Sequence, residues 1–471
     1  MDRPALGFLG ILAVAAGARI ALALLCPSAL GDGQIYETVA RNILVNGCVS
    51  LSSPESAACA PHWGGNQLPG FPAFVALTWA ITDGWSAAPL VAQALLSALA
   101  IGRLMSGLRA LEIEERYVLA CGALLALSPV TLPFSRLLWT EALAIAATTW
   151  VFAEFVRAEA SGRLALMPLA AALTAAFFIR LDGALLAIPF GIMALRLHAW
   201  REGLLRCLAV GLVVLSAYGL WSARSHLQGL GWAPKLIADL DGGTPRGFLR
   251  WTQSWMTNQY QLEAVNWPAI QRQYDAIVVP PEAYRSVDER REVEELLVRL
   301  HSSIGQPMPR AIADAFENIA ERRISTAPLD YWVLVPAKRA LWLWFNPFTA
   351  LGWPGKMDPA SKHNIAGAIS EGAIIAALET AMDDAPQLIL RVGGFGYRAA
   401  LVLAALAIGV VLWRKTPVVG RGVMIAALAF AAVRTAVFVF FGGVETRYIV
   451  EALPPLELAL VLAWASARQR P

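Results

Sequence analysis

Long apolar stretches separated by short polar turns dominate the hydrophobic pattern of this chain. Stretches near 20 residues suit helices that cross a hydrocarbon core of roughly 30 Å, whereas a membrane β-barrel would show short alternating strands. We therefore expect an all-α polytopic membrane protein. About ten transmembrane helices are predicted, at residues 5–25, 86–106, 117–134, 138–157, 164–180, 183–197, 205–222, 395–412, 421–441 and 448–466.

Basic residues gather in alternate turns between these stretches. Examples are Arg103 with Arg109, and Arg157 with Arg163. Positively charged turns stay on the cytoplasmic side of a membrane. Ten spans then place both termini in the cytoplasm, and we expect a multi-pass protein of the inner (plasma) membrane whose active site faces the periplasmic, extracytoplasmic side.

Two long segments fall on the outer side under this topology. Apolar pieces within them, 70–82 and 331–345, are too short or too interrupted to span, and their aromatic residues suit interfacial helices. The expected organisation is an N-terminal transmembrane catalytic module, 1–222, with seven spans and a first outer loop, 26–85; a mostly helical extracytoplasmic region, 223–394; and C-terminal transmembrane helices, 395–471.

Composition supports the membrane class and narrows the partners. Hydrophobic residues make up 57% of the 471 positions, charged residues 15%, and the mean hydropathy is +0.54, far from the values of soluble chains. The dispersed net charge of +3 excludes the continuous basic surface of a nucleic-acid binder. Cys48 and Cys59 share the first outer loop, so a disulfide between them and two unrelated cysteines remain equal alternatives.

Asp32 is the first candidate for chemistry. It follows the first span by a few residues in GDGQIYETVARNIL (Gly31 to Leu44), which continues as an amphipathic helical pattern. The turn would hold the carboxylate at the membrane surface. An Asp at this place also commonly caps a helix, so both roles stay open on spacing alone.

Further motifs follow Asp32 in a specific order. They are Tyr36, LPGFPAFVAL (Leu68 to Leu77), Ser135-Arg136, Thr140-Glu141, Arg180, and Arg447-Tyr448 in ETRYI. In these residues the chain resembles the GT-C fold membrane glycosyltransferases: the protein O-mannosyltransferases, which belong to glycosyltransferase family 39, the aminoarabinose transferase of lipid A and the catalytic subunit of oligosaccharyltransferase. The resemblance covers the N-terminal and C-terminal spans and leaves 223–394 poorly covered. This chain differs at Gly33, where several of the resembling enzymes have a second acid.

The resemblance implies an inverting glycosyltransferase that takes a sugar from a polyprenyl-phosphate donor. Asp32 would act as general base on the acceptor hydroxyl, and Arg447 and Arg180 would hold the departing phosphate. Glu141 would bind the acceptor, a divalent cation such as Mg, Mn or Zn, or an arginine. Asp32 and Glu141 are the expected ligands if a metal is used. The acceptor would be an extracytoplasmic glycolipid, envelope polysaccharide or protein.

Simpler roles stand beside these assignments. Arg180 could pair only with Asp182, Arg447 with Glu451 one helical turn later, and Glu141 could cap the span that follows it. Tyr36, His62 and Tyr448 are candidate acceptor or sugar contacts. For His62, a solvated loop histidine is the simpler interpretation.

Three ionisable residues, Arg19, Arg434 and Glu457, fall inside predicted spans, where charge is costly. At ~1.5 Å per residue they lie at a similar depth of roughly 10 Å from the outer surface. We predict a pair between Arg434 and Glu457. The alternative is an arginine, Arg434 among them, that reaches outward to the donor phosphate.

Other functional classes fit parts of this pattern. An O-antigen-type polysaccharide polymerase or ligase also works at the outer face with arginines on lipid phosphate, but it gives no reason for Asp32 directly after the first span. A secondary transporter should show inverted repeats and broken helices near the midplane. A non-catalytic assembly protein would tolerate the loss of Asp32 and Arg447.

Overall fold

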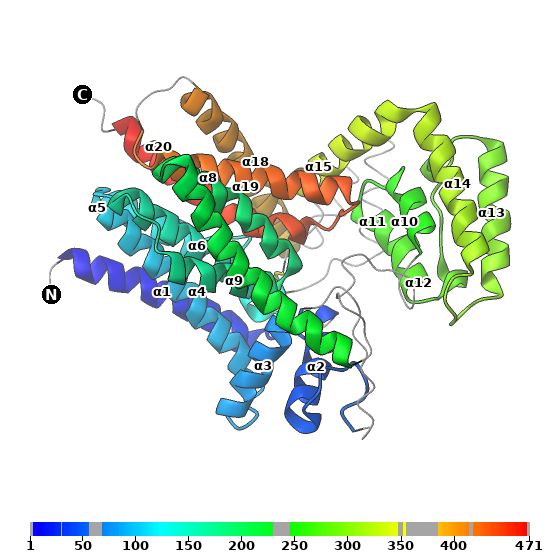
Figure 1. Ribbon diagram of the computed structural model, residues 1–471, viewed down its shortest axis with the longest axis horizontal. Coiled ribbons are helices and arrows are strands. Elements are labelled where there is room, and N and C mark those ends of the chain that lie inside the picture. Colours follow the sequence, from blue (N-terminus) through cyan, green and yellow to red (C-terminus); the bar gives the residue numbers. More distant parts are fainter. Residues whose placement is uncertain are drawn as a thin grey trace.

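A computed structural model describes residues 3–29, 31–55, 68–228, 245–346, 352–354, 385–413 and 418–468. Within these ranges the secondary structure is helical, and β-pairing is limited to an isolated bridge between Ser28 and Leu137. A bundle of long helices forms one part of the molecule, and a lobe of shorter helices lies at one end of it (Figure 1).

A helix occupies each of the ten predicted apolar stretches. These helices are α1 (Arg3–Leu25), α4 (Ala88–Ala110), α5 (Glu115–Leu127), α6 (Thr140–Ser161), α7 (Leu166–Ile179), α8 (Ala187–Leu197), α9 (Trp200–Leu227), α18 (Ala385–Trp413), α19 (Arg421–Phe440) and α20 (Leu453–Arg468). In the described residues, six helices are long and apolar enough to cross a membrane: α1, α4, α9, α18, α19, and α20 with the turn before it. The chain is therefore an all-α, multi-pass membrane protein, and these criteria give six spans where ten were predicted.

Shorter helices complete the fold. In the bundle they are α2 (Asp32–Asn46), α3 (Gly70–Ile81), η1 (Leu132–Arg136), η2 (Leu181–Leu186) and η7 (Thr446–Ala452). In and beside the lobe they are α10 (Arg246–Gln253), α11 (Gln259–Gln261), η3 (Leu262–Asn266), α12 (Trp267–Ile270), η4 (Tyr274–Ala276), η5 (Pro281–Ala283), α13 (Val287–His301), α14 (Arg310–Thr326), η6 (Asp330–Leu334) and α15 (Val335–Phe345).

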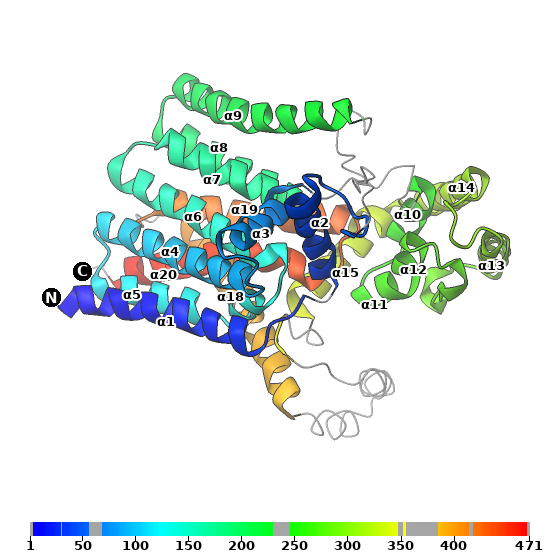
Figure 2. The same ribbon diagram turned by 90° about the horizontal axis from the view of Figure 1, so that it is seen from below.

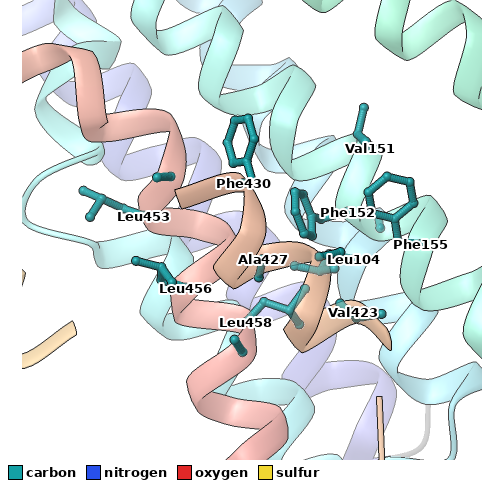
Figure 3. Close-up of a cluster of buried hydrophobic side chains, with 14 of the residues drawn as sticks. Leu104, Val151, Phe152, Phe155, Val423, Ala427, Phe430, Leu453, Leu456 and Leu458 are labelled. Carbon is teal, nitrogen blue, oxygen red and sulfur yellow. The ribbon is translucent and has the colours of Figure 1, made fainter. Parts of the chain in front are cut away.

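The centre of the bundle lies between α4, α6, α19 and α20. Figure 3 shows Leu104, Phe152, Phe430 and Leu458 from these helices meeting in one cluster, and each is at most 1% exposed. By contrast, α9 presents several exposed leucines on the outside of the bundle, such as Leu212 (Figure 2). This distribution fits a bundle with a tightly packed interior and a periphery that contacts lipid.

The helix directions place the chain ends and the lobe at opposite ends of the bundle. The start of α1 and the end of α20 lie at the same end of the bundle, and the lobe with α10, α13 and α14 lies away from them (Figures 1 and 2). The segments that lead into α2, α6, η2 and η7 all reach the end that faces the lobe. Residues far apart in sequence therefore meet there.

Arg19, Arg434 and Glu457 have partners other than those predicted. Arg434 binds Asp182 at 2.7 Å and also Glu451, whereas Glu457 accepts a hydrogen bond of 2.5 Å from the Tyr397 hydroxyl. The predicted Arg434–Glu457 pair is wrong, because it assumed one regular helix over 448–466. Residues 446–452 instead form the 3₁₀ helix η7, whose tighter turn changes which side chains face α19.

Arg19 stabilises the end of a short helix. Its guanidinium donates to the carbonyls of Leu125, at 3.0 Å, and Ala126, at 2.9 Å, which are among the last of α5. Carbonyls at a helix C-terminus have no partner within the helix and carry partial negative charge. The buried cation therefore lets α5 end within the bundle.

The lobe has its own hydrophobic core. Phe248 and Trp251 of α10 pack on Phe316 of α14, and all three are fully buried. A Cβ on Gly247 would lie 2.0 Å from the Ala313 carbonyl oxygen, so only glycine allows α10 to approach α14 this closely. Helix α13 begins with Ser286, whose hydroxyl accepts from the Glu289 amide.

Arg339 of α15 joins the lobe to the bundle. This buried side chain donates to the carbonyls of Met256 and Val439, both at 2.7 Å, and of Gln253. Two of these acceptors belong to the lobe and the third lies in α19. One guanidinium therefore ties the lobe to the lobe-facing end of a bundle helix.

We predict that Arg339→Met lowers the thermal unfolding temperature of the purified protein and exposes the lobe to limited proteolysis. The change leaves buried carbonyls without donors, at a cost of about 1–3 kcal/mol for each. Lys338→Met, at the exposed neighbouring position, is the matched control and should behave like the wild type. Equal stability of both variants would contradict this role of Arg339.

Candidate active site

Backbone pairing positions Asp32 beside the start of α6. The Ser28 amide donates to the Arg136 carbonyl at 2.9 Å, and the Leu138 amide donates to the Ser28 carbonyl at 3.0 Å. The Arg136 guanidinium also donates to the Cys26 carbonyl at 2.5 Å. The loop after α1 is thus fixed to the loop before α6. Asp32 is the first helical residue of α2, and Gly31 occupies the cap position without a side-chain cap.

Gly33 lies against this pairing. A Cβ at this position would meet the Leu138 carbonyl oxygen at 3.2 Å, which is closer than nearly all real Cβ contacts. A longer acidic side chain here would press on the 137–139 loop. The local packing therefore explains why this chain has glycine where several resembling enzymes have a second acid.

Arg447 joins Asp32 to the start of α6. Its Nη1 lies 2.6 Å from Asp32 Oδ2 and 3.5 Å from Glu141 Oε1, and its Nε lies 2.5 Å from Glu445 Oε2. The guanidinium also lies over the Trp139 ring, 5.0 Å from the centroid. Arg447 and Asp32, 415 positions apart in sequence, are in direct contact.

Arg180 contacts the same Glu141 from the α7–α8 hairpin. Its Nη1 lies 2.9 Å from Glu141 Oε1 and donates to the Thr140 hydroxyl at 2.9 Å. Its Nε lies 3.0 Å from Asp182 Oδ1 and 3.2 Å from Glu451 Oε1. Arg180 therefore makes the local pair with Asp182 and longer-range contacts with Glu141, Thr140 and Glu451 as well.

Arg434 is the most deeply buried member of the group. Its side chain is fully buried, binds Asp182 and Glu451, and donates to the Tyr448 carbonyl. Since Asp182 and Glu451 also bind Arg180, the arginines are linked through shared carboxylates. We call this set the acid–arginine network; its members are Asp32, Glu141, Asp182, Glu445, Glu451, Arg180, Arg434 and Arg447.

Exposure varies steeply across the network. The Asp32 side chain is 38% exposed, while those of the other four acids are between 1% and 14% exposed. Among the arginines, Arg447 is 18% exposed, Arg180 14% and Arg434 0%. The most accessible acid and the most accessible arginine are the two that touch each other.

Charge pairing keeps the hairpin acid ionised. Burial alone would raise the pKa of Asp182, but Arg180 and Arg434 lower it well below the usual range. Asp182 therefore stays a carboxylate throughout the neutral range. Its negative charge is available to hold both arginines.

Two tyrosines flank the network. Burial raises the pKa of Tyr36, and Asp32 and Glu141 raise it further, so this phenol stays neutral beside the carboxylates. The Tyr36 ring packs edge-on against Phe71, with 4.9 Å between centroids. The Tyr448 hydroxyl donates to Glu445 at 3.0 Å, and its ring stacks on Phe438.

The structure brings together seven of the predicted site residues and adds others. Asp32, Tyr36, Glu141, Arg180, Arg434, Arg447 and Tyr448 all contribute to the network or its edge. His62, and Cys59 of the candidate first-loop disulfide, lie outside the described residues. Glu445 and Trp139 were not predicted, and Asp182 and Glu451 were considered only as local partners. Glu445 precedes Arg447 by two positions, a spacing that is too common to have identified it.

The predicted metal ligands do not form a cation site in the described part of the chain. There, no group of three or more His, Cys, Asp or Glu side chains has the arrangement of a metal site. The Arg447 guanidinium contacts both Asp32 and Glu141, which were the expected ligands. We therefore derive no step through a metal ion.

Comparisons with known proteins give matches among solved structures alone. No family model matches the chain, and no curated protein does. Oligosaccharyltransferase from Archaeoglobus fulgidus with Zn and sulfate matches at 14% identity and a TM-score of 0.44, over 97% of this chain and 49% of that one. The archaeal oligosaccharyltransferase AglB from the same organism, with an inhibitory peptide and a dolichol-phosphate, matches at 12% identity and a TM-score of 0.44. This match covers 97% of this chain and 50% of that one.

The apo form of the same archaeal enzyme matches at 12% identity and a TM-score of 0.33, over 94% of this chain and 56% of that one. This chain spans about half the length of the first structures it matches. Oligosaccharyltransferase is one of the enzymes that the sequence motifs resemble. At this level of similarity the matches carry no argument about function. The proposed function rests instead on the residues of the site.

We predict that Asp182→Asn strongly destabilises the lobe-facing end of the bundle. Removing one partner of a buried ion pair typically costs about 3–5 kcal/mol, because the remaining charges lose compensation. The measurement is thermal unfolding of the purified protein. Asp83→Asn, in the exposed turn after α3, is the control and should leave the unfolding temperature unchanged. An unfolding temperature of Asp182→Asn equal to that of the wild type would show that Asp182 does not stabilise the network.

Proposed function

We propose that this protein is an inverting glycosyltransferase that moves a sugar from a polyprenyl-phosphate donor to an extracytoplasmic acceptor. The observation that carries the proposal is the contact between Asp32 and Arg447 at the lobe-facing end of the bundle. A base for an acceptor hydroxyl and a cation for a lipid phosphate are the two groups that such a reaction requires, and these two are the accessible members of the network.

The reaction forms one bond and breaks one. The acceptor oxygen attacks the anomeric carbon of the sugar, and the bond between that carbon and the phosphate oxygen breaks, so polyprenyl phosphate leaves with the electron pair. The acceptor proton passes to the Asp32 carboxylate, a transfer that typically contributes about 10²–10⁴-fold to the rate. Direct displacement inverts the anomeric centre.

Arg447 is the proposed phosphate-binding residue. Its guanidinium has five N–H donors, and its contacts with Asp32 and Glu445 occupy only some of them. A planar guanidinium matches phosphate oxygens and stabilises the charge that develops on the leaving group. Because the same group binds Asp32, phosphate and base would lie side by side.

The remaining predicted residues receive supporting roles in this proposal. Arg180 contributes a second positive charge close to the phosphate. Arg434, which is fully buried, holds Asp182 and Glu451 and acts as a positioning residue. Glu141 orients Arg180 and Arg447. Tyr36 and Tyr448, with His62, remain proposed contacts for acceptor or sugar.

We also propose the membrane arrangement of the site. Helices α5, α7 and α8 are 13, 14 and 11 residues long, or roughly 20 Å, 21 Å and 17 Å, and would complete their crossings together with the adjoining η1 and η2 turns. Ten crossings with basic inner turns place both termini in the cytoplasm and the network at the periplasmic face of an inner membrane.

Incubation of the purified protein with a panel of polyprenyl-phosphate sugars tests the proposed activity. We expect release of polyprenyl phosphate from at least one donor when an acceptor glycolipid, polysaccharide or peptide is present. The same panel is run with a chelator to detect a divalent cation requirement. No release from any donor would contradict the proposal and favour the polysaccharide polymerase or ligase.

We predict that Asp32→Asn lowers kcat by about 10²–10⁴-fold, because the amide cannot accept the acceptor proton. The KM for donor should change little by comparison. Glu37→Gln, a partly exposed acid five residues further along α2 and paired with Arg41, is the matched control and should retain activity. Unchanged turnover in Asp32→Asn would show that the base is another group.

We predict that Arg447→Gln raises the KM for donor and weakens inhibition by free polyprenyl phosphate. A lost charge-assisted hydrogen bond is worth about 1.5–3 kcal/mol, or roughly ten- to a hundredfold in affinity. Arg447→Lys retains the positive charge but lacks the paired N–H donors of a guanidinium. Its KM for donor should lie between those of the wild type and Arg447→Gln. Wild-type inhibition in both variants would separate Arg447 from phosphate binding.

A further inference from the structure

A second group of arginines surrounds a cavity at the opposite end of the bundle from the network. The cavity has a volume of about 360 Å³ and is lined by the ends of α4 and α6 and by the turn that leads to α7. Three arginines line it, Arg103, Arg157 and Arg163, with Glu154 as the acid among them. If all four are ionised, the lining carries an excess of positive charge.

Glu154 anchors the cationic side chains. Its side chain is 1% exposed, its Oε1 lies 2.8 Å from Arg103 Nε, and its Oε2 lies 4.0 Å from Arg157 Nε. The Arg103 guanidinium is also 5.9 Å from the centroid of the Trp150 ring. A buried carboxylate with these neighbours fixes arginine stems that would otherwise move freely.

The anchored arginines remain accessible. The Arg103 side chain is 32% exposed and that of Arg157 is 39% exposed. The Arg157 stem lies close to Gly107. A Cβ added to Gly107 would be 3.3 Å from the Arg157 Cγ. The close approach of α4 and α6 therefore directs these cations to one opening, which Arg163 joins from the α6–α7 turn.

The position of the cavity relative to the membrane surface indicates the kind of ligand. Helix α6 has 22 residues and is roughly 33 Å long, slightly more than a hydrocarbon core of roughly 30 Å. With Thr140 at one membrane surface, Ser161 lies at the headgroup layer of the other. Phosphate groups of lipids occupy that layer, and basic pockets between helix ends recognise them.

We propose that this cavity binds the phosphate of an anionic phospholipid headgroup. The three guanidinium groups would donate to the phosphate oxygens, and the alanines of the lining, Ala110, Ala158, Ala160 and Ala165, would contact the first methylene groups of the acyl chains. This site is separate from the network, and its occupancy does not depend on the glycosyl transfer proposed above.

Native mass spectrometry of the purified full-length protein tests the site with defined probes. We expect phosphatidylglycerol to bind at least about tenfold more tightly than phosphatidylcholine, because the zwitterionic headgroup adds a cation beside the arginines. A third arm contains inorganic phosphate alone. Equal binding of the two lipids, or saturation by inorganic phosphate without any preference for the lipid, would overturn the proposal.

Variants locate the binding. Arg157→Gln with Arg163→Gln should weaken phosphatidylglycerol binding by about tenfold or more. Arg116→Gln is the control, since Arg116 is an exposed arginine at the start of α5 that pairs with Glu114 and does not line the cavity. Both variants should unfold at the wild-type temperature without lipid. Wild-type affinity in the double variant would place the lipid elsewhere.

Discussion

The burial of the Arg434 guanidinium is the constraint on which the lobe-facing end of the bundle depends. A desolvated cation costs several kcal/mol unless well-placed anions compensate it. Asp182 and Glu451 provide that compensation from the α7–α8 hairpin and from η7. Because these two acids also bind Arg180, one buried cation fixes the position of the next. The loops at this end are therefore held by charge as well as by packing.

Exposure rises in steps from this base, and the steps suit a site for chemistry. Arg434 is fully buried, Arg180 and Arg447 are partly exposed, and Asp32 is the most accessible member. The buried members are paired on several sides, so contacts within the protein fix their positions. Preorganised charges of this kind stabilise developing charge more effectively than mobile ones. The accessible pair is thus held in place by residues that are more deeply buried.

The sequence allowed much of the bundle to be predicted, because apolar stretches and breakers are local signals. It did not allow the partners of buried charges to be predicted. Arg339 binds backbone carbonyls of the lobe and of α19, and carbonyls have no residue-specific signature. Arg434 was assigned to Glu457 because a regular helix was assumed where η7 turns more tightly. Asp32 and Arg447 were predicted from the order of several weak motifs, whereas Glu445 had no such support.

The sharing of Arg447 between base and phosphate has a consequence for the order of events in the proposed reaction. While Asp32 is ionised, it competes with the donor phosphate for the guanidinium that contacts it at 2.6 Å. When Asp32 accepts the acceptor proton, its negative charge disappears and that competition ends. Arg447 then interacts more strongly with the leaving phosphate, whose charge increases at the same moment. Proton transfer and leaving-group stabilisation are thereby coupled through one side chain, which favours the transition state over the bound substrate.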